Sequence, residues 1–179
     1  MRFQDLLTTA ELPELGPGPR AKVQSATELN RAVDMIAAGL RLERPGLDLV
    51  RGLVLLWHDR LEEGHVIAQQ IESADGSYLH GIMHRRETDY GNAKYWFRLV
   101  GRHACFGALA ERAGEWLRGR QQDRLAATLL PRGIWDPYAF IDACERASRL
   151  ASSDEEVSAL REIQAIELRT FLEQVGGAR

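Results

Sequence analysis

The sequence predicts an all-α protein, a single-domain and bundle-like array of about seven or eight helices. Apolar residues recur at helical spacing, capping residues begin several such segments, and strict apolar–polar alternation is absent. Residues 1–24 hold a short amphipathic piece and then three prolines in seven residues, which excludes a helix interior there. We therefore expect an N-terminal arm over residues 1–24 and one all-α domain over residues 25–179.

The first half of the domain contains the longest apolar stretch of the chain. Ser25 and Glu28 form a capping-box pattern that begins a helix ending at about Gly39. Residues 47–71 are apolar on more than one side and contain few β-branched residues, which predicts a central buried helix. Gly64 is the point where that helix could bend or divide.

Local signals set the boundaries of the remaining helices. Asp75-Gly76 predicts a turn, Ser77 a cap for a short helix through residue 86, and Asp89 a cap for another through residue 100. Asp136-Pro137 is a cap followed by proline at the first helical position, and residues 153–156 form a second capping box. The later helices are expected over about residues 106–117, 122–130, 137–150 and 154–175.

Composition restricts the classes of function. A net charge of −3 provides no basic field, so we do not expect nucleic acid as a partner. The longest apolar run, residues 53–57, is far shorter than the roughly 20 residues of a membrane span. Cys105 and Cys144 lie in apolar contexts typical of reduced thiols, and the chain begins without a secretory pattern. We expect a cytoplasmic protein with no membrane partner.

Four of the five histidines lie between His58 and His84, which locates a candidate site. On a continuous helix from Arg51 to Glu72, a polar stripe would project within about 40° of the direction of His58. Its members are His58, Glu62, His65, Gln69 and Glu72. Because such groups are costly to bury alone, the stripe either lines a polar cavity or faces solvent.

Metal-ligand spacing occurs twice in this segment. His80 and His84 are four residues apart on one helical face, and Glu87 falls on the same face. Glu62 and His65 have the Glu-x-x-His spacing of carboxylate-bridged metal bundles, although a second such pair is absent from the sequence. A metal would then bind His80, His84 and His65, while histidine pairs at this spacing also occur without metal.

A basic and aromatic segment follows the histidines. It contains Arg85, Arg86, Asn92, Lys94, Tyr95, Trp96, Arg98 and Arg102. The arginines could hold a phosphate or carboxylate while an aromatic ring stacks on a flat ligand. They could instead pair with carboxylates at positions 62, 72, 87 and 89, with the aromatic rings in the core.

Nucleophilic hydrolysis and nucleotide binding are not expected. Neighbouring residues of a helix point about 100° apart, so Asp59 cannot easily orient His58. Ser73 and Ser77 lack an elbow motif, and no glycine-rich phosphate loop occurs. Chemistry at this site would be acid/base catalysis by histidine or metal-assisted.

The segment from His80 to Gly101 resembles the signature of an uncharacterised protein family. It begins His-Gly-Ile-Met-His-Arg-Arg-Glu and continues Asp-Tyr-Gly-Asn-Ala-Lys-Tyr-Trp-Phe-Arg, and the likeness extends from about Leu56 through the final helix. Thr88 and Leu99 stand where that pattern has proline and arginine, which puts the loop at residue 88 and the basic stripe in doubt. The resemblance implies no activity, cofactor or partner.

Three hypotheses about function follow from these patterns. The leading one is a pocket for a small polar or anionic ligand, in which histidines act as acid/base or orienting groups. Its acid/base residues are His58, His65, His80 and His84, and its ligand-binding residues are Glu62, Glu72, Arg85, Arg86, Asn92, Tyr95, Trp96 and Arg98. The second is a His-ligated metalloprotein, and the third is a non-catalytic interaction module with a basic, aromatic surface.

Overall fold

The computed structural model describes residues 1–40 and 42–177, and within them it contains nine α-helices, two short 3-10 helices and no strand. The all-α prediction is confirmed, with slightly more helices than expected. The α-helices are α1 (Ala26–Ala37), α2 (Gly46–Trp57), α3 (Leu61–Ala68), α4 (Ala74–Arg86), α5 (Tyr90–Val100), α6 (Cys105–Gly119), α7 (Asp123–Leu129), α8 (Pro137–Ala147) and α9 (Glu155–Val175), and the 3-10 helices are η1 (Phe3–Leu6) and η2 (Pro131–Gly133).

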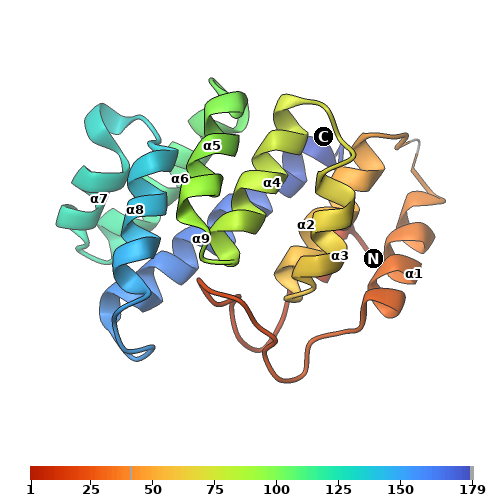
Figure 1. The fold of residues 1–179 in the computed structure, drawn as a ribbon, viewed down its shortest axis with the longest axis horizontal. Helices are drawn as coiled ribbons and strands as arrows, with labels where there is room; N and C mark the ends of the chain where they lie inside the picture. The colour runs from red at the N-terminus through yellow and green to blue at the C-terminus, as the bar shows by residue number, and fades with distance from the viewer. Residues whose placement is uncertain (41, 178–179) are drawn as a thin grey trace.

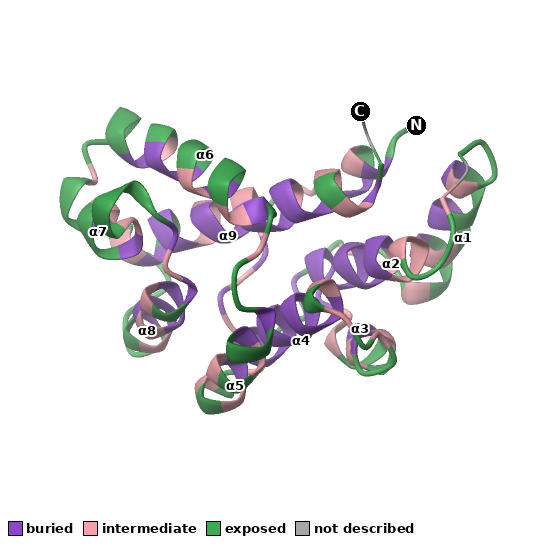
Figure 2. Ribbon diagram, turned by 90° about the horizontal axis from the view of Figure 1, so that it is seen from above, coloured by how far each residue is buried: buried purple, intermediate pink, exposed green. Residues whose placement is uncertain are grey.

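The long helix α9 connects the two halves of the molecule. It runs diagonally behind α4, α5 and α8 in Figure 1, and Figure 2 shows it beside α6 in the layer facing them. The C-terminal half of α9 contributes Leu168 and Phe171 to one buried apolar cluster, which also contains α2 and α4. Its N-terminal half contributes Leu160 and Ile163 to a second cluster with α6, α7 and α8. Its buried side chains therefore join both cores.

Capping residues predicted most helix starts correctly. Ser25, Asp89 and Asp136 each accept a hydrogen bond from a backbone N–H in the first turn of the helix they precede. The predicted cap Ser77 is wrong, because Ser73 caps α4 and places the expected Asp75-Gly76 turn inside that helix. The final helix is capped by Asp154 rather than by a box beginning at Ser153.

The expected continuous helix from Arg51 to Glu72 is wrong. The chain leaves the helix after Trp57, and Asp59 adopts a positive φ of 59° before α3 begins at Leu61. The carboxylate of Asp59 then lies 2.7 Å from both Arg20 Nε and Arg86 Nη2. These two ion pairs give a physical reason for the break, which falls before Gly64.

The N-terminal arm lies against the helices. Phe3, Leu6 and Leu7 are buried in the first core cluster, and Leu15 is buried in the second. The side chain of Gln164 on α9 donates a hydrogen bond of 2.8 Å to the Glu14 carbonyl. The arm therefore contributes to both cores, and a domain boundary near residue 24 stays a prediction.

Among the described helices, none combines the length and the apolar character needed to cross a membrane.

Candidate functional site

Three histidines from two packed helices meet at one point. Each of His65 on α3 and His80 and His84 on α4 offers a ring nitrogen, and these three nitrogens lie within 4.8 Å of one another. Nε2 of His80 is 3.1 Å from Nε2 of His65, and the parallel rings of His80 and His84 have centroids 4.9 Å apart. The one-turn spacing on α4 aligns two imidazoles, and α3 supplies the third.

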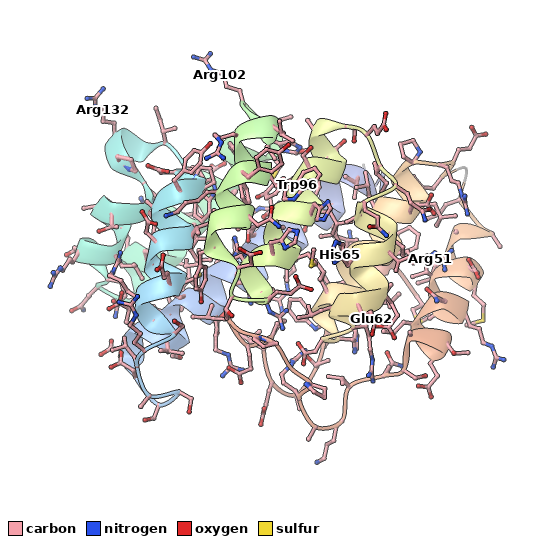
Figure 3. All side chains as sticks on the ribbon, in the orientation of Figure 1. Arg51, Glu62, His65, Trp96, Arg102 and Arg132 are labelled. Carbon is pink, nitrogen blue, oxygen red and sulfur yellow. The ribbon has the colours of Figure 1, made fainter. Side chains whose placement is uncertain are left out.

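Helix α5 forms a wall of this cluster. The Trp96 ring stacks on the His80 ring with centroids 3.9 Å apart, and Nδ2 of Asn92 lies 3.1 Å from Nε2 of His84. Figure 3 shows Trp96 and His65 on the same face of the molecule. Gly81 permits the close approach of α4 and α5, because a Cβ at this position would lie 2.7 Å from the Phe97 ring.

Glu87, at the end of α4, faces two of the imidazoles. One carboxylate oxygen is 3.3 Å from Nδ1 of His84, and the other is 3.9 Å from Nδ1 of His65. A proton on Nδ1 of His84 would point at this carboxylate and leave a lone pair on Nε2, toward the Asn92 amide. The sequence placed Glu87 on the histidine face but gave it no role in the site.

Burial favours the neutral forms of His80 and His84. It lowers the pKa of His80 to about 4, and the neighbouring His84 and His65 act in the same direction. Burial also lowers the pKa of His84, although Glu87 opposes that shift. Nδ1 of His80 is buried and has no hydrogen-bond partner among the described residues. Neutral imidazoles with free lone pairs are the form that binds metal ions.

The fourth histidine of the predicted site is used elsewhere. Nε2 of His58 lies 2.9 Å from the Leu6 carbonyl oxygen, and Nδ1 accepts a hydrogen bond of 3.3 Å from the Gln24 backbone N–H. Because the chain breaks after Trp57, His58 fixes the N-terminal arm to the body and does not join the other three. Burial lowers its pKa as well.

The predicted carboxylates are also outside the cluster. Glu62 and Glu72 are exposed: Glu62 lies on α3 three residues before His65 but faces solvent, and Glu72 lies beyond the end of α3 at Ala68. Figure 3 shows Glu62 on α3, apart from the His65 side chain.

Arg85 and Arg86 are fully buried and hold internal carboxylates. Arg85 forms a two-pronged ion pair with Glu167 on α9, while Arg86 binds Asp59. The structure therefore contains the arginine–carboxylate pairing that the sequence suggested, with carboxylates other than those expected. The guanidinium groups expected to bind an anionic ligand are directed to partners inside the protein.

The remaining residues of the basic segment lie partly at the surface. Tyr95 is about half exposed (48%), and the Arg98 guanidinium lies 5.7 Å from the centre of its ring. Lys94 forms an ion pair of 2.5 Å with Asp142. The use of this surface for a partner stays a prediction.

Comparison with protein-family models, curated proteins and solved structures found no significant match to this chain. Its function is inferred from the geometry alone.

Proposed function

We propose that the protein binds one divalent transition-metal ion of the zinc class through His65, His80 and His84. The observation that carries this proposal is the convergence of three imidazole nitrogens within 4.8 Å. With zinc–nitrogen bonds of about 2.0–2.1 Å, the ligand nitrogens of a tetrahedral site are about 3.3 Å apart. His65 and His80 are already at 3.1 Å, so small side-chain rotations would complete the set.

The surroundings of the cluster suit a metal centre. The burial that lowers the pKa of His80 and His84 reduces competition from protons near neutral pH. Glu87 takes the place of the outer carboxylate that commonly accepts a hydrogen bond from a metal-bound histidine. The Trp96 ring covers His80 and limits the access of water on that side.

Three protein ligands would leave a coordination position open. Zinc sites with three protein ligands keep that position for water or a substrate, and the metal lowers the pKa of the bound water or polarises the bound group. His65 is the most exposed of the three, with 35% of its side chain accessible, and Glu87 beside it is exposed to 33%. A small polar or anionic ligand would then be held by the metal rather than by Arg85 and Arg86.

The test uses the full chain, purified without a polyhistidine tag and freed of metal with a chelator. We expect calorimetric titration with Zn²⁺ to give one site of micromolar or tighter affinity, and Co²⁺ to give the visible absorption of a tetrahedral complex. The double variant His65→Gln/His84→Gln should lose both signals. His58→Gln is the matched control and should keep them, since His58 contacts the arm.

Trp96 provides a second readout at the site itself. Cu²⁺ bound beside the stacked indole should quench its fluorescence, and Trp96→Phe should lose most of this quenching while it still binds Zn²⁺. Trp116→Phe removes a distant tryptophan and should leave the quenching in place. Absence of a stoichiometric Zn²⁺ or Co²⁺ site, or binding that survives the double histidine substitution, would refute the proposal.

A further inference from the structure

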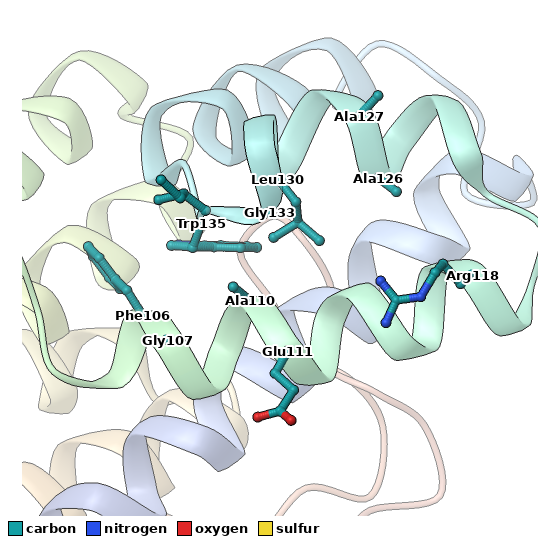
Figure 4. Close-up of a pocket in the computed structure, with 11 residues that line it drawn as sticks. Phe106, Gly107, Ala110, Glu111, Arg118, Ala126, Ala127, Leu130, Gly133 and Trp135 are labelled. Atoms are coloured by element: carbon teal, nitrogen blue, oxygen red, sulfur yellow. The ribbon is translucent and has the colours of Figure 1, made fainter.

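We propose a second binding site, between α6, α7 and the segment at residues 133–135, for a small molecule with an apolar body and one negative charge. A hollow of about 580 Å³ lies there, within the size range of small-molecule pockets. Figure 4 shows it bounded by α6 on one side and α7 on the other, with the Trp135 ring closing one end. The site shares no residue with the histidine cluster.

Small side chains on the facing helices leave this space open. Gly107 and Ala110 line it from α6, and Ala126 and Ala127 line it from α7. Gly107 is exposed, and a Cβ placed there would meet no atom within 4 Å, so a larger side chain has room at this position. Since most of the accessible lining is apolar, the body of the occupant should be apolar too.

Arg118 supplies the charge that the occupant would match. It is the only basic residue of the lining; it is exposed, and its side chain forms no ion pair or hydrogen bond within the described part of the chain. Figure 4 shows its guanidinium turned toward the hollow, while the Glu111 carboxylate points to the other side of α6. A guanidinium at the end of an apolar pocket suits a carboxylate, which it can bind with two parallel hydrogen bonds.

Trp135, one of the lining residues, carries an unpartnered polar atom. Trp135 is 3% exposed, and its buried indole nitrogen has no hydrogen-bond partner among the residues that the structure describes. Buried indole N–H groups usually find an acceptor, so an unpaired donor on a residue of the lining is unusual. Since this nitrogen is inaccessible in the structure, the Trp135 side chain would have to rotate before an oxygen of the occupant could accept its hydrogen bond.

The probe is naphthalene-2-carboxylate, compared with the neutral naphthalene-2-carboxamide, each titrated calorimetrically into the full chain. We expect the carboxylate to bind at about millimolar affinity or tighter, as befits a ligand of this size. The amide should bind about tenfold more weakly, because it loses the charge-assisted contact. Arg118→Gln should weaken the carboxylate to the level of the amide, and Gly107→Leu should fill the hollow and abolish the binding of both.

Two controls keep this test separate from that of the metal site. Arg102→Gln removes the same charge from an exposed position outside the lining and should leave the affinity unchanged. All measurements are made with chelator present, and Zn²⁺ binding by Arg118→Gln should equal that of the wild type. No binding of the probe, equal binding of acid and amide, or unchanged binding by Arg118→Gln would overturn this proposal without affecting the metal site.

Discussion

The carboxylate of Glu87 lies 3.3 Å from Nδ1 of His84, which precedes it by three residues at the end of α4. This contact gives His84 a fixed acceptor on one ring nitrogen and leaves the other nitrogen with its lone pair. The same carboxylate is 3.9 Å from Nδ1 of His65, so one acidic group can orient two of the three proposed ligands.

Substitution Glu87→Gln should therefore weaken metal binding without unfolding the protein. Loss of an outer-shell partner typically reduces metal affinity about 10–100-fold, and we expect a change in this range in a competition titration with a Zn²⁺ indicator. Glu62→Gln is the control, because Glu62 is exposed on α3 and should leave the affinity unchanged. Equal affinities of Glu87→Gln and wild type would remove Glu87 from the site.

Features fixed by neighbouring residues could be read from the sequence. The caps at Ser25, Asp89 and Asp136 were predicted because a cap depends only on the next few backbone groups. The alignment of His80 and His84 followed from their spacing on one helix. His65 was also predicted to bind a metal ion together with this pair. The packing of α3 on α4 brings the three histidines together.

Features that depend on distant residues were missed. The break at Asp59 accompanies ion pairs with Arg20 and Arg86, which are 39 and 27 residues away in the chain. The residues around Asp59 carry no local signal for this helix end, because the partners of its carboxylate are distant in the sequence. This break removed His58 from the site, whereas Glu72 is separated from His65 by the end of α3 at Ala68 and Glu62 faces solvent on α3.

The pH dependence of stability should carry a contribution from His58. Burial lowers its pKa in the folded protein below the ordinary value of 6.5, so between these two pKa values the unfolded chain binds a proton that the native state does not. The free energy of unfolding should therefore fall as the pH decreases below 6.5, by at most about 1.4 kcal/mol per pH unit from this group. The group's full contribution is present above pH 6.5.

Because burial also lowers the pKa of His80 and His84, the contribution of His58 must be isolated by a variant. Urea unfolding of wild type and His58→Gln at two pH values, about 7.5 and about 5.5, with chelator present, does this. The destabilisation caused by His58→Gln should be smaller at the lower pH. A difference independent of pH would show that His58 titrates alike in both states.

The buried pair of Arg85 and Glu167 predicts a large stability effect. Both side chains are completely inaccessible, and Tyr78 donates a further hydrogen bond of 3.2 Å to Glu167. Glu167→Gln leaves the Arg85 charge buried without a counter-charge, which should cost about 3–5 kcal/mol in the free energy of unfolding. The exposed pair of Arg112 and Glu173 supplies the comparison, and Glu173→Gln should cost less than about 1 kcal/mol.

The double variant Arg85→Met/Glu167→Leu distinguishes the cost of an unpaired buried charge from the cost of lost side-chain packing. Replacing both partners with apolar side chains removes the uncompensated charge, so its stability should exceed that of Glu167→Gln. Chemical denaturation of the wild type, Glu167→Gln, Glu173→Gln and the double variant measures these differences in the free energy of unfolding. A double variant less stable than Glu167→Gln would indicate that the Arg85 side chain stabilises mainly by packing, for instance through its contact of 4.3 Å with the Phe140 ring.

Gly81 tests how closely α5 must lie on α4 for the site to form. A Cβ at this position would come within 2.7 Å of the Phe97 ring, and Phe97 is only 1% exposed and has little room to move. Gly81→Ala should therefore destabilise the protein by about 1–3 kcal/mol, despite the greater helix propensity of alanine. Because a shift of α5 would move Trp96 away from His80, the quenching of Trp96 by Cu²⁺ should weaken as well.

Gly91 on α5 is the matched control, since a Cβ there meets no atom within 4 Å. Gly91→Ala should leave the quenching intact and raise stability by up to about 1 kcal/mol. Similar melting temperatures for the two alanine variants would mean that α5 can retreat from α4 at little cost.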